Sequence, residues 1–237
     1  METEQKQNPI STPVAILIAG VLIAGGVYAG LRADSAPTPS NPKAGIETSA
    51  ELKNMRAVGV DDHIRGNPDA EVVIVEYSDT ECPFCKRFHE TMKQVTTEYG
   101  DQVAWVYRHF PLDSLHKKAR NEAVALECAN ELGGNDAFWA YADRLFAVTP
   151  SNDGLDPAEL PKIAAYVGLD AAAFTACASS DRYDAHIQSD LDNATATGGN
   201  GTPWSIVVGK NGKMYPLSGA QPYESVKQLI ELARSGK

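Results

Sequence analysis

One stretch of this 237-residue chain constrains the fold more than any other, namely residues 72–88, VVIVEYSDTECPFCKRF. Its β-branched run, Val72 to Val75, predicts a strand that is buried on both faces of a sheet. A segment with helical character follows within a few residues. Pro83 suits the first turn of that helix because it has no N–H to leave unsatisfied. The stretch therefore predicts a buried strand that leads into a helix, with Cys82 and Cys85 at the junction.

A cysteine at a helix N-terminus has a specific chemical consequence. Unpaired backbone N–H groups and the positive end of the helix dipole stabilise an anion there, which favours the thiolate, the nucleophile of disulfide exchange. At an ordinary pKa of ~8.5 only about 3% of a thiol is ionised at pH 7, and lowering the pKa by about three ionises almost all of it. We expect Cys82, nearer the helix start and solvent, to form the mixed disulfide and Cys85 to resolve it.

Two other uses of the cysteine pair are possible. The pair could ligate zinc, with His89 or the distant cysteines completing four ligands, but structural zinc usually draws on a second closely spaced pair, which this sequence lacks. Haem attachment requires histidine directly after the second cysteine, where Lys86 stands. We therefore favour redox chemistry and predict no metal ligands. Inert buried cysteines are the remaining interpretation.

The wider pattern resembles the DsbA-like thiol-disulfide oxidoreductases, which have a thioredoxin fold. Glu76 lies six residues before Cys82, where these proteins carry a buried acidic residue. Residues 107–112, YRHFPL, look like the second core strand and its exit, and residues 201–208, GTPWSIVV, match the Thr–cis-Pro loop and the strand after it. The resemblance extends from about Val58 to Arg234 and covers most of the chain.

The resemblance implies an α/β thioredoxin fold with an inserted helical subdomain. The chain divides into a leader (1–13), a transmembrane anchor or signal sequence (14–31), a linker (32–57) and a DsbA-like thioredoxin domain (58–237) whose helical insertion spans about 114–197. Within the domain we expect an edge strand at 58–62, a helix at 83–99, a strand at 103–109, helices at 115–132, 138–146, from 156 to 168, 170–179 and 180–197, a β-hairpin around 207–215 and a final helix at 222–233.

The N-terminal segment is read from its composition. Residues 14–31 form an eighteen-residue run without a charge, which as a helix covers roughly 27 Å, close to a ~30 Å hydrocarbon core. This length favours an uncleaved anchor over a signal peptide, whose apolar region usually runs about 7–15 residues, although Val27-Tyr28-Ala29 would suit cleavage. The Pro-rich linker is too short for a separate dimerisation domain of the DsbC kind, and we expect a monomer.

The resemblance also assigns supporting residues. It implies a cis peptide bond at Thr202-Pro203, opposite Cys82, with the Thr202 backbone free to pair with a substrate strand. Phe84 stands where DsbA itself has a histidine that helps to stabilise the thiolate; a phenylalanine can instead contact an unfolded substrate or simply pack. Pro83 completes the motif.

Glu76 and two histidines are also candidates for a functional role. By resemblance, Glu76 is a buried proton acceptor for Cys85, and burial would raise its pKa. The alternative is a solvated acid at the end of the strand. We read His109 and His116 as structural or surface residues.

A second cysteine pair, Cys128 and Cys177, falls inside predicted helices of the insertion, 49 positions apart. Many DsbA-like proteins with this layout carry a disulfide at such positions, so the resemblance implies a structural disulfide; two buried free thiols are the alternative. A disulfide would stabilise the fold by roughly 4 kcal/mol in the chain-entropy model and would indicate an oxidising compartment.

Together these features predict an extracytoplasmic thiol-disulfide oxidoreductase, tethered to the cell membrane or, after cleavage, secreted. The net charge of −10 without a basic patch argues against nucleic acid. We expect a dithiol oxidase for reduced or unfolded exported polypeptides that needs no bound cofactor. By resemblance, a quinone-linked membrane partner of the DsbB or VKOR kind would reoxidise it. A reductase or isomerase using the same site is the alternative, and a non-catalytic chaperone-like binding module is a third reading.

Overall fold

The structure, a computed structural model, describes residues 50–236. The expected leader, the apolar segment 14–31 and most of the linker lie outside the described residues. Within residues 50–236, no helix combines the length and the apolar character that crossing a membrane requires.

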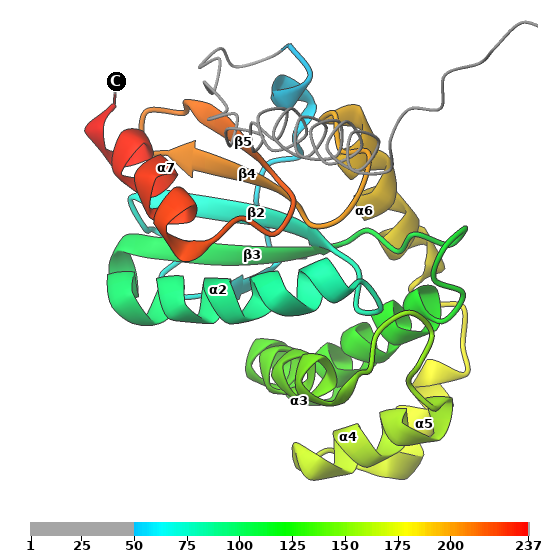
Figure 1. The fold of residues 1–237 in the computed structure, drawn as a ribbon. Helices are drawn as coiled ribbons and strands as arrows, with labels where there is room; N and C mark the ends of the chain where they lie inside the picture. Colours follow the sequence, from blue (N-terminus) through cyan, green and yellow to red (C-terminus); the bar gives the residue numbers. More distant parts are fainter. Residues whose placement is uncertain (1–49, 237) are drawn as a thin grey trace, which may run out of the picture. The chain divides into compact units, whose positions relative to one another are not determined.

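A five-stranded mixed sheet forms the centre of this domain (Figure 1). Its strand order is β1-β3-β2-β4-β5, and only the pair β2 and β3 is parallel. The strands are β1 (His63–Arg65), β2 (Val72–Ser78), β3 (Val103–His109), β4 (Trp204–Gly209) and β5 (Met214–Ser218). β2 lies between two strands and both of its faces are covered, which confirms the buried strand expected from its β-branched residues.

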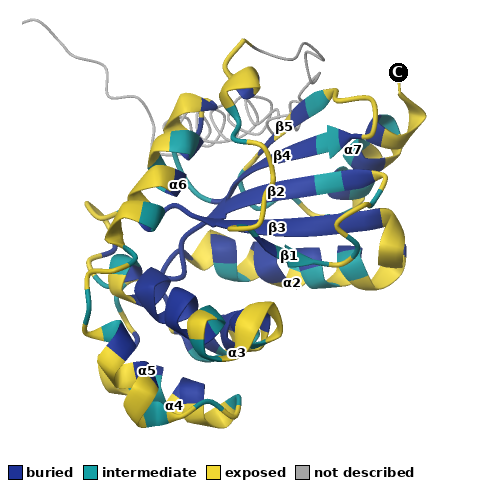
Figure 2. Ribbon diagram, turned by 180° about the vertical axis from the view of Figure 1, so that it is seen from behind, coloured by how far each residue is buried: buried dark blue, intermediate teal, exposed yellow. Residues whose placement is uncertain are grey.

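Helices cover both faces of the sheet. Successive residues of β3 point to opposite faces of the sheet and pack in different hydrophobic cores. Trp105 packs in the core with α2 (Pro83–Tyr99) and α7 (Tyr223–Ser235). Val106 packs in the core on the other face, with α6 (Asp184–Ala196). A short 3₁₀ helix, η1 (Leu52–Asn54), lies on the α6 side, and another, η2 (Gly100–Gln102), links α2 to β3. Figure 2 shows β2 and β3 buried between these layers.

The helical insertion lies between β3 and β4 in the chain. It comprises α3 (Ala119–Val148), η3 (Pro157–Glu159), α4 (Leu160–Tyr166), α5 (Ala171–Ala178) and α6. Gly134, at φ 72° and ψ −171°, breaks α3 into two segments, close to where the sequence predicted a stop. The side chains of Asp156 and Asp170 cap η3 and α5 by accepting backbone N–H groups. The thioredoxin fold with a helical insertion is thus present.

The predicted edge strand at 58–62 is wrong, because the edge strand is β1, at residues 63–65. Residues 59–62 form a turn in which Gly59 N–H donates to Asp62 Oδ2 (2.8 Å). Asp62 is held there by Arg108, whose Nε lies 2.7 Å from Oδ1. This ion pair occupies the segment that the sequence assigned to the strand, so pairing with β3 begins only at His63.

Three other boundaries differ from the prediction. The helix expected from Leu115 begins at Ala119, because His116 binds Asp79 and holds the preceding residues in an irregular connection. The helix expected from Ser180 begins at Asp184, after a turn. Residues 52–54, assigned to the linker, form η1, in which Leu52 is buried in the core beside α6.

Candidate active site

The cysteine pair lies where β2 passes into α2. Cys82 has extended backbone angles (φ −78°, ψ 121°) and occupies the N-cap position of α2, and Pro83 is the first helical residue. The unpaired N–H groups at this end of the helix therefore surround the Cys82 side chain. The sequence prediction of a strand, a short turn and a helix that starts at Pro83 is confirmed.

The two sulfurs have different environments. Cys82 is 4% exposed and Cys85 is fully buried, and both are free thiols in this structure. Cys82 Sγ lies 3.6 Å from the carbonyl oxygen of Thr202, and Cys85 Sγ accepts a hydrogen bond from the backbone N–H of Asp79 at 3.4 Å. Cys82 is thus the cysteine that an incoming disulfide or thiol can reach, with Cys85 behind it.

Because their environments differ, the two thiols have different pKa values. A hydrogen bond from the Cys85 thiol, with others from Thr202 and the backbone N–H groups of Cys85 and Phe84, lowers the pKa of Cys82 to about 6 against the opposing effect of burial. Burial, together with the neighbouring Cys82 thiolate, raises the pKa of Cys85 well above its ordinary value. At neutral pH the reduced site therefore holds one thiolate on Cys82 and one thiol on Cys85.

Glu76 is buried behind the cysteines. Burial raises its pKa to about 7, although hydrogen bonds from Ser78 and from the Trp105 indole, whose Nε1 lies 2.8 Å from Oε2, oppose the shift. Its charge acts on Cys85, whose pKa it raises. A carboxyl that gains and loses a proton near neutral pH beside the resolving thiol can accept the proton of Cys85. The alternative of a solvated acid does not apply, since Glu76 is 1% exposed.

The loop before β4 forms the second wall of the site. The Thr202-Pro203 peptide bond is cis, and Pro203 is buried. β4 pairs antiparallel with β2, with Trp204 opposite Tyr77, so this loop lies beside the end of β2 that leads to Cys82. The nucleophile and the Thr202 backbone therefore share one surface, as the resemblance implied.

Phe84 differs from the buried residues around it because its side chain projects outward. It is 52% exposed, one of the few large apolar residues that the described part of the chain leaves open, and the Arg87 guanidinium lies 5.2 Å from its ring centre. Pro83 is also exposed. The two residues between the cysteines thus present an apolar surface next to Cys82, which fits contact with a substrate better than internal packing.

Several polar residues beneath the cysteines were missed by the sequence analysis. Asp79 accepts from the backbone of Glu81 and Leu112 and from His116 Nδ1 (2.9 Å), although burial raises its pKa. Burial opposes protonation of His116, but Asp79 and, more weakly, the Cys82 thiolate raise its pKa. His116, read as structural or surface, is thus a buried hydrogen-bond partner of Asp79 close to the active site. Little in the sequence indicated this role for His116, because residues 79 and 116 come into contact only in the folded chain.

A buried carboxyl pair lies beside this cluster. Burial, and a hydrogen bond shared with Glu81, raise the pKa of Glu122 to about 9, so Glu122 is protonated at neutral pH. The remaining oxygen of Glu81 accepts the backbone N–H of Asp153 at 2.6 Å. The two acidic residues Asp79 and Glu81, between a buried strand and a helix, were the available signal together with Glu122 of α3, because acids in such a position must be accommodated inside the protein.

Glu81 also ties the cysteine loop to the insertion. Residues Ser151, Asn152 and Asp153 adopt φ values of 66°, 54° and 62°, conformations that cost non-glycine residues about 1 kcal/mol or more each. Glu81 stabilises this turn through its side chain and through its carbonyl, which accepts the N–H of Asn152. Lys86 adds a bond to the carbonyl of Thr149 at 2.6 Å. The insertion is therefore anchored to residues on either side of Cys82, namely Glu81 before it and Lys86 in α2.

The second cysteine pair is bonded. Cys128 in α3 and Cys177 in α5 form a disulfide across a Cα–Cα distance of 5.8 Å. These cysteines are unavailable as zinc ligands beside Cys82 and Cys85. His89 Nε2 donates to Asp143 Oδ1 at 2.7 Å. The disulfide therefore removes Cys128 and Cys177 from the zinc alternative.

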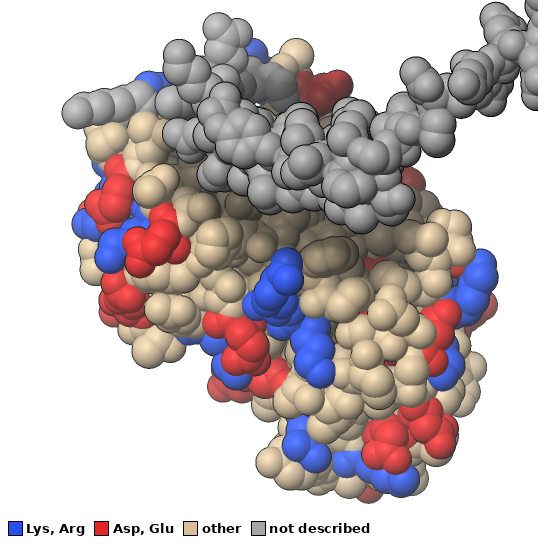
Figure 3. Space-filling view, viewed as in Figure 1, with Lys and Arg blue, Asp and Glu red and all other residues tan. Residues whose placement is uncertain are grey.

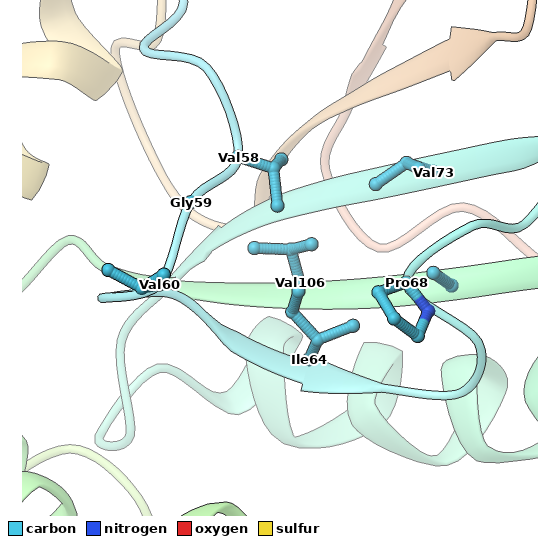
Figure 4. A pocket seen from close by; sticks show the side chains of 8 residues that line it. Val58, Gly59, Val60, Ile64, Pro68, Val73 and Val106 are labelled. Atoms are coloured by element: carbon cyan, nitrogen blue, oxygen red, sulfur yellow. The ribbon is translucent and has the colours of Figure 1, made fainter.

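An apolar pocket of about 400 Å³ lies on a different part of the domain (Figure 4). Its walls come from the turn before β1 and from β1, β2 and β3; they include Val58, Ile64, Val73 and Val106. No cysteine lines it, so it is separate from the redox site. On the face seen in Figure 3, acidic and basic side chains form small mixed groups rather than an extended basic surface.

Comparison with known proteins supports the reading of the site. The family described as Thioredoxin matches residues 59–232. DsbA2 from Pseudomonas aeruginosa is 30% identical with a TM-score of 0.66, and the match covers 76% of this chain and 98% of that protein's chain. BdbD from Bacillus subtilis, in its oxidised form, shares the fold with a TM-score of 0.63 at 21% identity, over 73% of this chain and 92% of the other.

Curated sequence relatives are longer proteins. "Na(+)/H(+) antiporter NhaA 1" from Mycolicibacterium gilvum is 35% identical over 162 residues, which is 67% of this chain and 25% of that protein. The protein of the same name from Mycobacterium sp. (strain KMS) is 34% identical over 202 residues, 84% of this chain and 31% of that protein. This chain spans about a quarter to a third of the length of these relatives, and the antiporter name describes those proteins.

The thioredoxin family match, the similarity to DsbA2 over nearly all of that protein and the paired thiols of opposite acidity agree with one another. The chain belongs to the thioredoxin family. Within that family it is one of the DsbA-like thiol-disulfide oxidoreductases.

Proposed function

We propose that this protein is a dithiol oxidase that transfers the Cys82–Cys85 disulfide to reduced polypeptides. A substrate thiolate attacks Cys82 Sγ, which forms a mixed disulfide and releases Cys85 as a thiolate. A second substrate thiolate then attacks the substrate sulfur of the mixed disulfide and releases Cys82. Two substrate thiols lose two electrons and two protons. The enzyme gains the electrons as the Cys82 thiolate and the Cys85 thiol, so Cys85 takes up one proton and the other passes to solvent.

The observation that carries this proposal is the lowered pKa of Cys82, at about 6. Stabilising the Cys82 thiolate stabilises the reduced enzyme relative to its disulfide, and a disulfide whose reduced form is stabilised is a stronger oxidant. Thr202, the backbone N–H groups and the Cys85 thiol supply this stabilisation, so the histidine that Phe84 replaces is not required for it.

The location and the partners belong to the same proposal. A bonded Cys128–Cys177 pair is typical of proteins in an oxidising compartment. We place the catalytic domain on the extracytoplasmic side, tethered by residues 14–31, with exported polypeptides as substrates. A quinone-linked membrane protein of the DsbB or VKOR kind would accept the two electrons of the dithiol and regenerate the disulfide.

The reduction potential of the Cys82–Cys85 couple tests the direction of electron flow. The full chain is equilibrated with reduced and oxidised glutathione, and the free thiols are quantified after acid quenching. A potential near about −120 mV, as in strongly oxidising family members, supports the oxidase. A potential near about −270 mV, as in thioredoxin, rejects it and favours a reductase that depends on an electron donor.

A chaperone-like binding module is distinguished by one variant. Cys82→Ala removes the accessible sulfur and leaves the surface around Phe84 and Thr202 in place. An oxidase loses all ability to form disulfides in a reduced substrate, whereas a binding module retains its full effect on substrate folding. Circular dichroism of the variant checks that the fold is unchanged.

A further inference from the structure

Three histidines converge on one carboxylate away from the active-site cysteines. The Nε2 atoms of His63, His109 and His186 lie 2.7, 2.8 and 3.5 Å from the same oxygen, Oε1 of Glu127. One ligand atom from each of these four residues lies within 4.8 Å of all the others. The chain has five histidines in total, so more than half of them meet at this point.

The four residues come from four separate elements. His63 begins β1, His109 ends β3, Glu127 lies in α3 and His186 lies in α6. β1 and β3 are antiparallel neighbours, which brings the first two histidines to one edge of the sheet. α3 and α6 belong to the helical insertion, so the cluster joins the sheet to the insertion (Figure 1).

The cluster packs on Phe138 and has one open side. His63 stacks on Phe138 with ring centres 3.6 Å apart and planes 10° apart, and His109 packs edge-on against the same ring. His63, His109 and Glu127 are buried, whereas the His186 side chain is 25% exposed. Packing on Phe138 thus orients two of the donors, hydrogen bonds hold Glu127 between them, and an ion in solution can approach past His186.

Hydrogen bonding alone does not account for all of this convergence. His63 and His109 already contact Glu127 Oε1 at hydrogen-bond distance, and His186 is directed at the same atom from 3.5 Å, without a hydrogen bond of its own to it. The nearest further carboxylate is Asp190, whose Oδ2 lies 3.8 Å from His186 Nε2 and accepts the backbone N–H of His109. Asp190 Oδ1 binds Arg56, so this arginine is neutralised beside the cluster.

We propose that His63, His109, Glu127 and His186 form a binding site for one divalent transition-metal ion, of which Zn²⁺ is the best suited. Imidazole nitrogens and a carboxylate are ligands that Zn²⁺ accepts in a four-coordinate site. Metal–ligand bonds of about 2.0–2.1 Å in a tetrahedron place ligand atoms roughly 3.3 Å apart, so Glu127 Oε1 would move away from two histidines by about half an ångström.

Four protein ligands would fill the coordination shell and leave no position for a substrate, so the ion would be structural. It would cross-link β1, β3, α3 and α6. His109 pairs with Ser78 at the end of β2, immediately before the turn that leads to Cys82. The ion would thus hold the insertion against the strand ends that carry the active site.

Titration of the full chain with Zn²⁺ against a chromophoric chelator tests the site. The protein is purified in detergent, stripped with chelator and oxidised, so that Cys82 and Cys85 are bonded to each other and offer no thiolate. One Zn²⁺ per chain is expected to bind and to raise the midpoint of thermal unfolding. Co²⁺ is expected to give the intense visible bands of a tetrahedral site.

His186→Ala is the test variant, because His186 is the most exposed ligand and the fold depends on it least. It is expected to weaken Zn²⁺ binding at least about tenfold and to abolish the thermal shift. His116→Gln, a buried histidine outside the cluster, is the matched control and is expected to keep both. Absence of stoichiometric binding in the parent, or equal Zn²⁺ affinity in His186→Ala and the parent, would overturn the proposal.

Discussion

Cys82 Sγ lies 3.6 Å from the carbonyl oxygen of Thr202, a residue 120 positions further along the chain. This relationship places the nucleophile of α2 against the backbone of the loop that leads into β4. A substrate strand that pairs with the Thr202 backbone would bring its own sulfur to Cys82, so binding and thiol exchange can occur on one surface.

The alkylation rate of reduced Cys82 is expected to rise with pH around a midpoint near 6, the value to which its pKa is lowered. About 90% of the thiol is then ionised at pH 7. Because the pKa in the folded protein is depressed, the thiolate stabilises the reduced fold fully above about pH 8.5, and this contribution is lost as the pH falls through 6. Iodoacetamide labelling followed by mass spectrometry measures the profile.

Cys85→Ala provides the control for this titration. The Cys85 thiol is the largest contributor to the lowered pKa of Cys82, so its removal is expected to move the midpoint upward. A midpoint near about 8.5 in the parent protein would show that the helix N-terminus and its neighbours do not stabilise the thiolate.

Glu76→Gln is expected to change how stability depends on pH. The pKa of Glu76 is raised to about 7 by burial, whereas an unfolded glutamate titrates near about 4.3. The neutral carboxyl therefore contributes stability that is fully present below about pH 4.3 and is lost as the pH rises through 7. Relative to Glu76→Gln, the parent should lose on the order of 3 kcal/mol of unfolding free energy across that window.

Urea unfolding of the reduced proteins at several pH values measures this difference, in which the titration of Cys82 largely cancels. Glu224→Gln, at an exposed position in α7, is the control and should follow the parent. A parent and a Glu76→Gln variant with parallel pH profiles would contradict the buried, protonated state of Glu76. Slower attack of Cys85 on a mixed disulfide at Cys82 in Glu76→Gln would support the role of Glu76 as proton acceptor.

Phe84→Ser is expected to discriminate between large and small substrates. Phe84 is 52% exposed beside Cys82, and burial of a phenylalanine against an unfolded chain is worth about 1–2 kcal/mol. The KM for a reduced, unfolded protein should therefore rise about five- to tenfold, whereas exchange with glutathione should change little. Val60→Ser, which alters a fully exposed apolar residue at the pocket of Figure 4, is the matched control.

If Phe84→Ser leaves the KM for the unfolded protein unchanged, Phe84 does not contact the substrate. If Val60→Ser raises that KM instead, the apolar pocket rather than the CxxC surface binds the polypeptide. Kinetics with both substrates on the same protein preparations separate these outcomes from general loss of activity.

Replacement of Cys128 and Cys177 by alanine is expected to lower the free energy of unfolding by about 4 kcal/mol, because their bond closes a loop across 49 positions. The reduction potential of Cys82–Cys85 should be unchanged, since the active site lies at the junction of β2 and α2. Denaturant unfolding of the variant and of the parent, both with the active site reduced, measures the effect. A loss under about 1 kcal/mol would show that the unfolded chain gains little freedom when the bond is removed.

Elements governed by local chemistry were predictable. The β-branched run of β2, the proline at the first position of α2 and the aspartates that cap η3 and α5 each act within a few residues. The boundaries of α2 and β3 were therefore predicted to the residue. Gly134 also marked the break in α3, because it adopts a positive φ that other residues avoid.

Two boundary predictions were wrong because a side chain near the boundary hydrogen-bonds to a residue that is distant in sequence. Arg108 of β3 holds Asp62, so the edge strand begins one residue later than the predicted strand ends. Asp79 binds His116, so α3 begins at Ala119 rather than at Leu115. In both cases a buried side-chain hydrogen bond to a carboxyl group outweighs the local helix or strand preference, and such partners are separated by dozens of residues.

The sequence by itself determined the redox pair and its position at a helix N-terminus, because these follow from residue type and short-range order. The layout of the thioredoxin fold came from the resemblance that the motifs carry. Only the tertiary structure decided which acids are buried, which histidines meet and what lies against the sulfur of Cys82. Burial and convergence depend on chain segments that are remote in sequence, as Glu81 with Glu122 and the four residues around Glu127 Oε1 illustrate. The pKa values and the candidate metal site therefore belong to the fold rather than to any local motif.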